Sequence, residues 1–162
     1  MRRLSSHGYV GPARYALTFC TLGRRLLFTS DTVVAPVRSQ IPRTATSFDF
    51  DVVAYCFMPD HLHLLVEAGG RTSSLVAFVK AAKQASGYHA KVVLGEQLWQ
   101  TGYFERVMRS DQETKTVALS VVQNPVRAGL VADASDYPYT GSSRYSVREL
   151  ITWLQDVDSR PT

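Results

Sequence analysis

The segment Phe48–Glu67, with the sequence FDFDVVAYCFMPDHLHLLVE, contains two runs of strand-forming residues on either side of a tight turn. Phe48–Phe57 begins with strict apolar–polar alternation and continues as an apolar run of the kind found in buried strands. Met58–Asp60 supplies the turn, and His61–Glu67 returns as an antiparallel strand. The segment therefore predicts a β-hairpin.

Two histidines lie on one face of the second predicted strand. Because successive side chains of a strand point to opposite faces, His61 and His63 share a face with Leu65 and Glu67. The other face carries Leu62, Leu64 and Val66 and is apolar. The two Cα atoms should be about 6.6 Å apart. Imidazoles at that spacing can converge on one cation or one phosphate. The other interpretation is a pair of solvent-exposed histidines on a sheet.

Further strands and helices are predicted on both sides of the hairpin. Strands are expected at Tyr15–Thr21 and within Leu98–Val107, and helices over Thr32–Ile41, Thr72–Val93, Ser110 to about Gln123, and Tyr145–Leu154. Ser110 and Glu113 form a capping box, Pro42–Ser47 is expected as a polar loop, and Pro125 is expected just past the third helix. This order predicts an α+β fold, a ferredoxin-like antiparallel sheet with helices on one face.

The length of 162 residues predicts a single domain over 1–162, with residues 1–12 and 156–162 as flexible ends. An apolar share of 45% and a charged share of 20% exclude a largely disordered chain. No apolar run approaches the roughly 18 residues of a membrane span, so we expect no membrane partner and no signal peptide. Cys20 and Cys56 are too few for a disulfide framework, which predicts a cytoplasmic location.

The charge distribution indicates an anionic partner. The net charge is +4, and 14 of the 18 basic residues are Arg, which binds phosphate through a planar fork and so favours nucleic acid. A genome whose codons favour arginine explains the same count. The acidic residues Asp49, Asp51, Asp60 and Glu67 concentrate in residues 49–68, which contain no Lys or Arg.

A second group of candidate residues lies on the helix that follows Ser110. Ser120 and Asn124 are four residues apart and therefore share a helix face. The Asn124 amide can supply an oxygen ligand to a hard cation and complete a mixed nitrogen–oxygen site with the two histidines. The other interpretation is that Asn124 caps the end of the helix.

Several segments, in this order and spacing, resemble the REP-associated tyrosine transposases, which belong to the single-tyrosine HUH transposases and nucleases. The segments that carry the resemblance are Tyr15–Thr21 with Arg24–Phe28, Met58–Glu67 (MPDHLHLLVE), Leu98–Arg109 (LWQTGYFERVMR), Asn124–Val131 (NPVRAGLV) and Asp136–Ser143 (DYPYTGSS). The His61–His63 motif alone is a weak signal for the family, whereas the full set of segments is specific.

The resemblance implies a ferredoxin-like fold and the cleavage and joining of single-stranded DNA. In such enzymes a tyrosine attacks the scissile phosphate and forms a 5′-phosphotyrosine link, and a divalent metal, Mg²⁺ or Mn²⁺, polarises the phosphate. Carried over to this chain, His61 and His63 are metal ligands, and Asn124 completes the metal site.

This sequence departs from the family pattern at the nucleophile, because the position four residues before Asn124 holds Ser120. A serine hydroxyl is harder to deprotonate than a phenol and lies closer to the backbone. Three hypotheses remain: an inactive form that still binds DNA, a substitute tyrosine (Tyr103 or Tyr88), or attack by Ser120 itself.

Other residues are candidates for DNA contacts, with solvated surface or core positions as the alternatives. The basic candidates are Arg24, Arg25, Lys80, Lys83, Arg106, Arg109 and Arg127, and the aromatic candidates for base stacking are Trp99, Tyr103 and Phe104. The function hypotheses are therefore a metal-dependent transposase or endonuclease acting on single-stranded or hairpin DNA, and a module that binds such hairpins without cutting. Monomer and homodimer both stay open. A histidine-triad hydrolase is set aside because the third alternating position holds Leu65.

Overall fold

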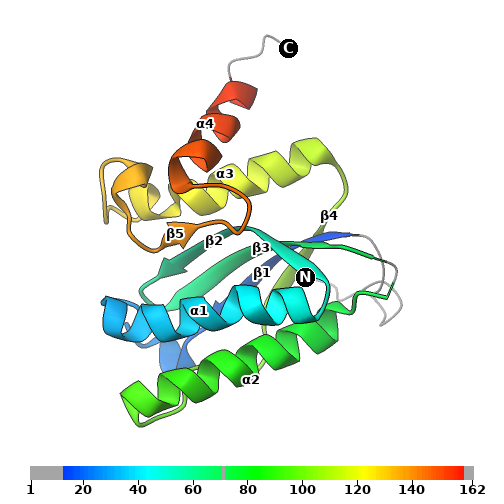
Figure 1. Ribbon diagram of the computed structural model, residues 1–162. Coiled ribbons are helices and arrows are strands. Elements are labelled where there is room, and N and C mark those ends of the chain that lie inside the picture. Colours follow the sequence, from blue (N-terminus) through cyan, green and yellow to red (C-terminus); the bar gives the residue numbers. More distant parts are fainter. Residues whose placement is uncertain (1–12, 71, 159–162) are drawn as a thin grey trace.

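The computed structural model describes residues 13–70 and 72–158, which form one antiparallel sheet and the helices that cover it (Figure 1). The strands are β1 (Arg14–Cys20), β2 (Phe50–Met58), β3 (His61–Ala68), β4 (Phe104–Met108) and β5 (Thr140–Gly141), and the helices are α1 (Asp31–Ser47), α2 (Leu75–Leu94), α3 (Asp111–Arg127) and α4 (Val147–Asp158). The strand order is β4-β1-β3-β2-β5, and every pairing is antiparallel. The predicted α+β class with an antiparallel sheet is therefore confirmed.

The predicted hairpin is the centre of this sheet. Strands β2 and β3 pair with Met58 opposite His61, close to the predicted boundaries, and β3 also pairs with β1 along its length. The apolar face of β3 is buried as expected, with Leu62, Leu64 and Val66 packed in one core with residues of α1 and α2. The alternation in the sequence therefore identifies the main core.

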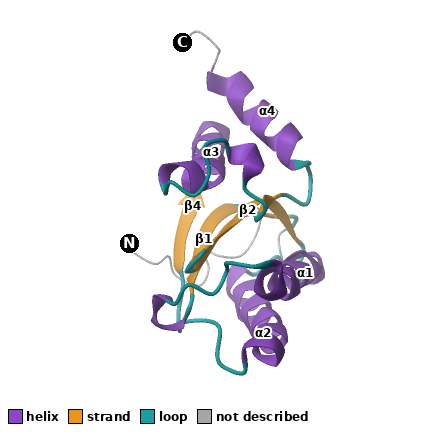
Figure 2. Ribbon diagram, turned by 90° about the vertical axis from the view of Figure 1, so that its left-hand side faces the viewer, coloured by secondary structure: helices purple, strands orange, loops and turns teal. Residues whose placement is uncertain are grey.

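Helices cover both faces of the sheet, which corrects the expectation of helices on one face. Helices α1 and α2 lie side by side on one face, and α3 lies on the other with α4 beyond it (Figures 1 and 2). The second face has its own apolar cluster, in which Leu65, Val53 and Ala54 of the hairpin pack with Ala118 and Leu150. A β-bulge between Val52 and Ala54 contributes to this cluster because it interrupts the strict alternation of β2.

Helix α4 ends at Asp158 rather than at Leu154, and α1 and α3 run through prolines past their predicted ends. Helix α1 continues to Ser47 and contains Pro42, because Ala45 extends the buried stripe of Ile41 by one turn. The hydroxyl groups of the expected polar loop bond back to helix carbonyls, as Thr44 Oγ1 does to Gln40. The hydroxyls of Thr46 and Ser47 bond in the same way to the carbonyls of Pro42 and Arg43.

Helix α3 likewise continues through Pro125 to Arg127. Pro125 is buried in this last turn, so packing holds a helical geometry that its missing N–H alone would disfavour. The predicted start is confirmed, because the Ser110 side chain accepts a hydrogen bond from the backbone N–H of Glu113 at 3.0 Å. Asn124 therefore lies inside the helix and is not its C-terminal cap.

The acidic segment contains a pair of like charges that a third residue neutralises. Asp51 and Glu67 are directly opposite each other on β2 and β3, an arrangement that is unfavourable for two carboxylates. The Arg144 guanidinium forms ion pairs with both of them. This bridge ties the C-terminal part of the chain to the central hairpin.

Two further expectations concern the flexible ends of the chain and the absence of a membrane span. Of the predicted flexible ends, residues 1–12 and 159–162 lie outside the described residues, and 156–158 are the last residues of α4. Among residues 13–70 and 72–158, none of the helices combines the length and the hydropathy of a transmembrane segment.

We predict that Ser86→Ala destabilises the protein by about 1–3 kcal/mol, measured as the free energy of unfolding in urea. Ser86 is fully buried on α2, and its hydroxyl accepts a hydrogen bond from Trp99 Nε1 at 2.9 Å. The substitution leaves the buried indole N–H without this acceptor. The control Ser39→Ala removes an exposed hydroxyl on α1 and should change stability by less than about 0.5 kcal/mol. Equal stabilities of the two variants would contradict a stabilising role for the buried hydrogen bond between Trp99 and Ser86.

Candidate functional site

The two histidines of β3 point their outer ring nitrogens at each other. His61 Nε2 and His63 Nε2 are 3.0 Å apart, and the rings meet nearly at right angles, with an interplanar angle of 87°. Both side chains project from the face of the sheet that α3 covers, as alternation on β3 predicts. The structure therefore brings together the pair of nitrogen donors expected from the sequence.

The inner nitrogen of each ring is held by a neighbouring side chain. His61 Nδ1 bonds to Asp60 Oδ1 at 2.6 Å, and Arg24 Nε donates to the other carboxylate oxygen of Asp60 at 3.0 Å. His63 Nδ1 lies 3.2 Å from Thr18 Oγ1, because Thr18 is the partner of His63 across β1 and β3. These contacts fix the orientation of both rings, an arrangement typical of the residues that surround metal-binding histidines.

The protonation of these groups suits cation binding. Burial, with added repulsion from His61, Arg127 and Arg24, lowers the pKa of His63 to about 4, so this ring is neutral at neutral pH. Burial alone would raise the pKa of Asp60, but hydrogen bonds and charge from His61 and Arg24 outweigh it and hold the pKa below its usual value. The ionised Asp60 carboxylate accepts a hydrogen bond from His61 Nδ1–H, and the imidazole tautomer that carries its proton on Nδ1 has its lone pair on Nε2.

A cavity of about 420 Å³ lies between α3 and strands β1, β3 and β4, next to the histidine pair. Its lining includes His63, Ser120, Asn124, Arg106 and Arg127. Strands β3 and β4 and helix α3 therefore bring three kinds of predicted residue to one cavity. These are a metal ligand, the residue at the nucleophile position and the DNA contacts.

Ser120 lies at the edge of this cavity and is exposed. Arg127 Nη2 donates to both the carbonyl oxygen and the Oγ of Ser120, at 2.8 and 3.1 Å. Within the described residues, the partner found for Ser120 Oγ is this cation, and a guanidinium cannot accept the hydroxyl proton. The serine therefore lacks the adjacent base that activates an alcohol as a nucleophile.

Tyr103, the candidate substitute nucleophile, belongs to the other face of the sheet. Its ring packs edge-on against Phe19 of the main core, with centroids 6.2 Å apart. Tyr103 lines a separate cavity of about 230 Å³ that shares Thr18 and Phe104 with the cavity under α3. The other candidate, Tyr88, is exposed on α2 and is also absent from the lining of the cavity under α3.

The basic candidates lie on both faces of the sheet, and some of them form ion pairs with carboxylates. Arg106 lines the cavity under α3 and pairs with Glu113 at 2.7 Å, and Arg109 is exposed just beyond the end of β4. Arg24 positions Asp60, whereas Arg25 forms an ion pair with Glu96 away from the cavity. Lys80 and Lys83 line a different groove, on α2.

Sequence reasoning missed two residues of the site. The sequence predicts Asp60 as the residue that closes the turn in preference to a metal ligand, whereas its carboxylate orients the ring of the adjacent His61. Thr18 carries no local signal, because its role depends on the register of β1 against β3.

The donor set fits a cation with mixed nitrogen and oxygen ligands. The two Nε2 atoms converge, and the Asn124 amide shares the adjoining cavity with His63. Cys56, the partner of His63 on β2, is buried, which raises the pKa of its thiol to about 11 and disfavours a thiolate ligand. Within the described ranges there is no group of three or more His, Cys, Asp or Glu that could hold a metal. A cation between the two histidines would therefore need further ligands, and the Asn124 amide is an oxygen donor in the adjoining cavity.

Comparison with known proteins identifies relatives. A family model described as "Transposase IS200 like" matches residues 10–119, more than half of the chain, and ends one residue before Ser120. A Haemophilus influenzae protein provisionally named a REP-associated tyrosine transposase is 25% identical over 118 residues, which cover 66% of this chain and 67% of that protein.

Two solved structures share the fold. One is a REP-associated tyrosine transposase bound to a REP hairpin, with a TM-score of 0.72 and 20% identity over 89% of this chain and 82% of that one. The other is a provisionally assigned transposase from Deinococcus radiodurans, with a TM-score of 0.54 and 26% identity over 76% of this chain and 97% of that one. With the match of the family model, these findings show that the chain belongs to the IS200-like transposases.

Proposed function

We propose that this protein binds hairpin-forming single-stranded DNA and holds one backbone phosphate between its histidine pair and the cavity under α3. The observation that carries the proposal is the convergence of His61 Nε2 and His63 Nε2, 3.0 Å apart, beside a cavity that Arg106 and Arg127 line. Two oriented imidazoles supply cation ligands, and the guanidinium groups supply charge-assisted donors to phosphate oxygens. Family membership and the fold shared with a hairpin-bound transposase support DNA as the partner.

The cation in this proposal is Mn²⁺ or Mg²⁺, held by His61, His63 and the Asn124 amide. When bound, such an ion polarises the phosphate and neutralises charge that develops on it. Asp60 and Thr18 keep the imidazoles aimed at the ion, and Arg127 holds Ser120 at the edge of the cavity. The free, buried thiols Cys20 and Cys56 support a cytoplasmic location for this activity.

Position 120 determines whether binding leads to cleavage. Ser120 has a guanidinium beside its hydroxyl instead of a base, and Tyr103 packs on the opposite face of the sheet. The geometry therefore best supports a hairpin-binding protein that retains the family's metal site without forming a covalent DNA link. The alternative, a strand-cutting transposase or endonuclease, needs a nucleophile from elsewhere in the chain.

We predict that the double variant His61→Gln, His63→Gln loses Mn²⁺ binding, measured by isothermal titration calorimetry. Asp60→Asn should weaken binding by about 10–100-fold, because it removes the carboxylate that orients His61. His89→Gln is the matched control, since His89 is exposed on α2 and lies outside the cavity under α3. Unchanged Mn²⁺ affinity in the double variant would refute the metal site.

We predict that the wild-type protein forms no covalent adduct with a labelled hairpin oligonucleotide in the presence of Mn²⁺, measured on a denaturing gel. Ser120→Tyr should gain an adduct, because a phenol at this exposed position borders the cavity. The adduct should persist in the combined variant Ser120→Tyr, Tyr103→Phe. A wild-type adduct that Tyr103→Phe abolishes would instead support the cutting enzyme, with Tyr103 as its nucleophile.

A further inference from the structure

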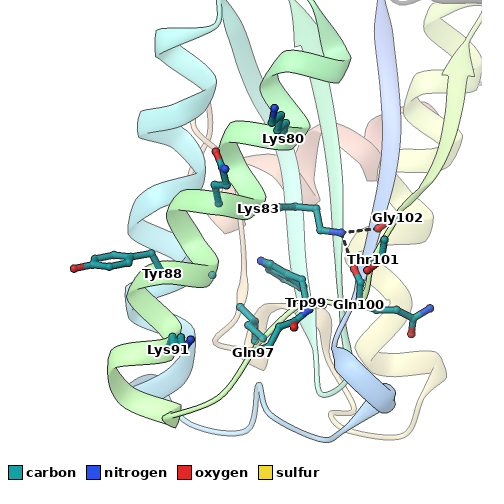
Figure 3. Close-up of a pocket in the computed structure, with 12 residues that line it drawn as sticks. Lys80, Lys83, Tyr88, Lys91, Gln97, Trp99, Gln100, Thr101 and Gly102 are labelled. Carbon is teal, nitrogen blue, oxygen red and sulfur yellow. Dashed lines mark hydrogen bonds between the residues drawn. The ribbon is translucent and has the colours of Figure 1, made fainter.

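A second groove, of about 580 Å³, lies between α2 and the loop of residues 95–103, on the face of the sheet away from the histidines (Figure 3). Lys80, Lys83 and Lys91 of α2 line it together with residues 97–102 of the loop, and its lining contains no Asp or Glu. A groove with three cations and no acid favours an anionic occupant.

The three lysines have different roles. Lys83 Nζ donates to the carbonyl oxygens of Gln100 and Gly102 at 2.7 and 2.6 Å, so it fastens the loop to α2 (Figure 3). Lys80 and Lys91 are exposed, and within the described residues neither forms an ion pair. They are eleven residues apart on one helix, about 16 Å along its axis. The exposed ammonium groups of Lys80 and Lys91 therefore line the groove and can contact a ligand.

The loop that forms one wall of the groove is anchored to the end of β1. The N–H of Gln100 donates to the Cys20 carbonyl at 2.9 Å, and the N–H of Leu22 donates to the Leu98 carbonyl at 2.8 Å. With the Lys83 bonds on its other side, this loop is tied by hydrogen bonds both to α2 and to the end of β1.

The groove joins the cavity under α3 through the intermediate cavity next to Tyr103. The intermediate cavity shares Gln100, Thr101 and Gly102 with the groove, and Thr18 and Phe104 with the cavity under α3. Phe104 is 61% exposed at this junction, a high value for an aromatic side chain on a strand. A chain of hollows thus passes around the β4 edge of the sheet, from the histidine face to the α2 face.

We propose that these hollows form one track for single-stranded DNA, in which the unpaired segment adjoining the hairpin leaves the histidine site, passes Phe104 and reaches the groove on α2. Phosphates of this segment contact Lys80 and Lys91, and a base stacks on Phe104 at the turn around the edge. This inference rests on the proposed function, because the hairpin itself occupies the site under α3. It assigns the lysines to the unpaired segment and not to the hairpin.

The test compares a hairpin without a tail to the same hairpin with a thymidine tail at either end, using fluorescence anisotropy in Mn²⁺ at several salt concentrations. Wild-type protein should bind a tailed hairpin more tightly than the tail-less one. Lys80→Ala combined with Lys91→Ala should remove this gain and leave tail-less binding unchanged. The slope of log affinity against log salt for the tailed DNA should fall by about 1.4, or about 0.7 for each lost phosphate contact.

The control is Arg43→Ala, which removes one exposed cation from α1 on the same side of the sheet and outside the track. It should keep the gain from the tail. Equal wild-type affinity for tailed and tail-less hairpins, or equal loss in the lysine and arginine variants, overturns the track and leaves the proposed function standing. A wild-type protein that binds neither DNA overturns both.

Discussion

Strand β3 lies between β1 and β2 at the centre of the sheet, and its side chains pack on both faces. Leu62, Leu64 and Val66 build the main core with α1 and α2, and this burial forces His61 and His63 onto the opposite face. A shift of one residue in register would bury the imidazoles in an apolar core. The stability of the main core and the placement of the histidines therefore have one cause.

One side chain adjacent in sequence and two distant ones orient the histidine pair. Arg24 holds Asp60, Asp60 holds His61, and Thr18 holds His63. These contacts bring the two Nε2 atoms within 3.0 Å of each other and fix the orientation of both rings. In contrast, Ser120 is held by Arg127, a contact that suits phosphate binding more than proton removal. The site is better organised for binding than for nucleophilic attack.

Local patterns in the sequence predicted the hairpin, the shared face of the histidines and the Ser110 cap, because each depends on neighbouring residues alone. The second covered face was missed, since Leu65 and the bulge at Val52 and Ala54 meet Ala118 only through tertiary packing. Packing likewise carries α1 and α3 past prolines where propensity predicted an end. The bonds from Lys83 to the loop are non-local as well, so a lysine expected at DNA also has a structural role.

In the proposed function the two imidazoles hold one divalent cation beside a cavity for phosphate. Anomalous diffraction at the manganese absorption edge, from a crystal soaked in Mn²⁺, would locate this cation. We expect one anomalous peak within coordination distance of both His61 Nε2 and His63 Nε2, on the side of the cavity under α3. A peak bound by only one of these nitrogens, or rings that keep their mutual contact while manganese binds elsewhere, would contradict it.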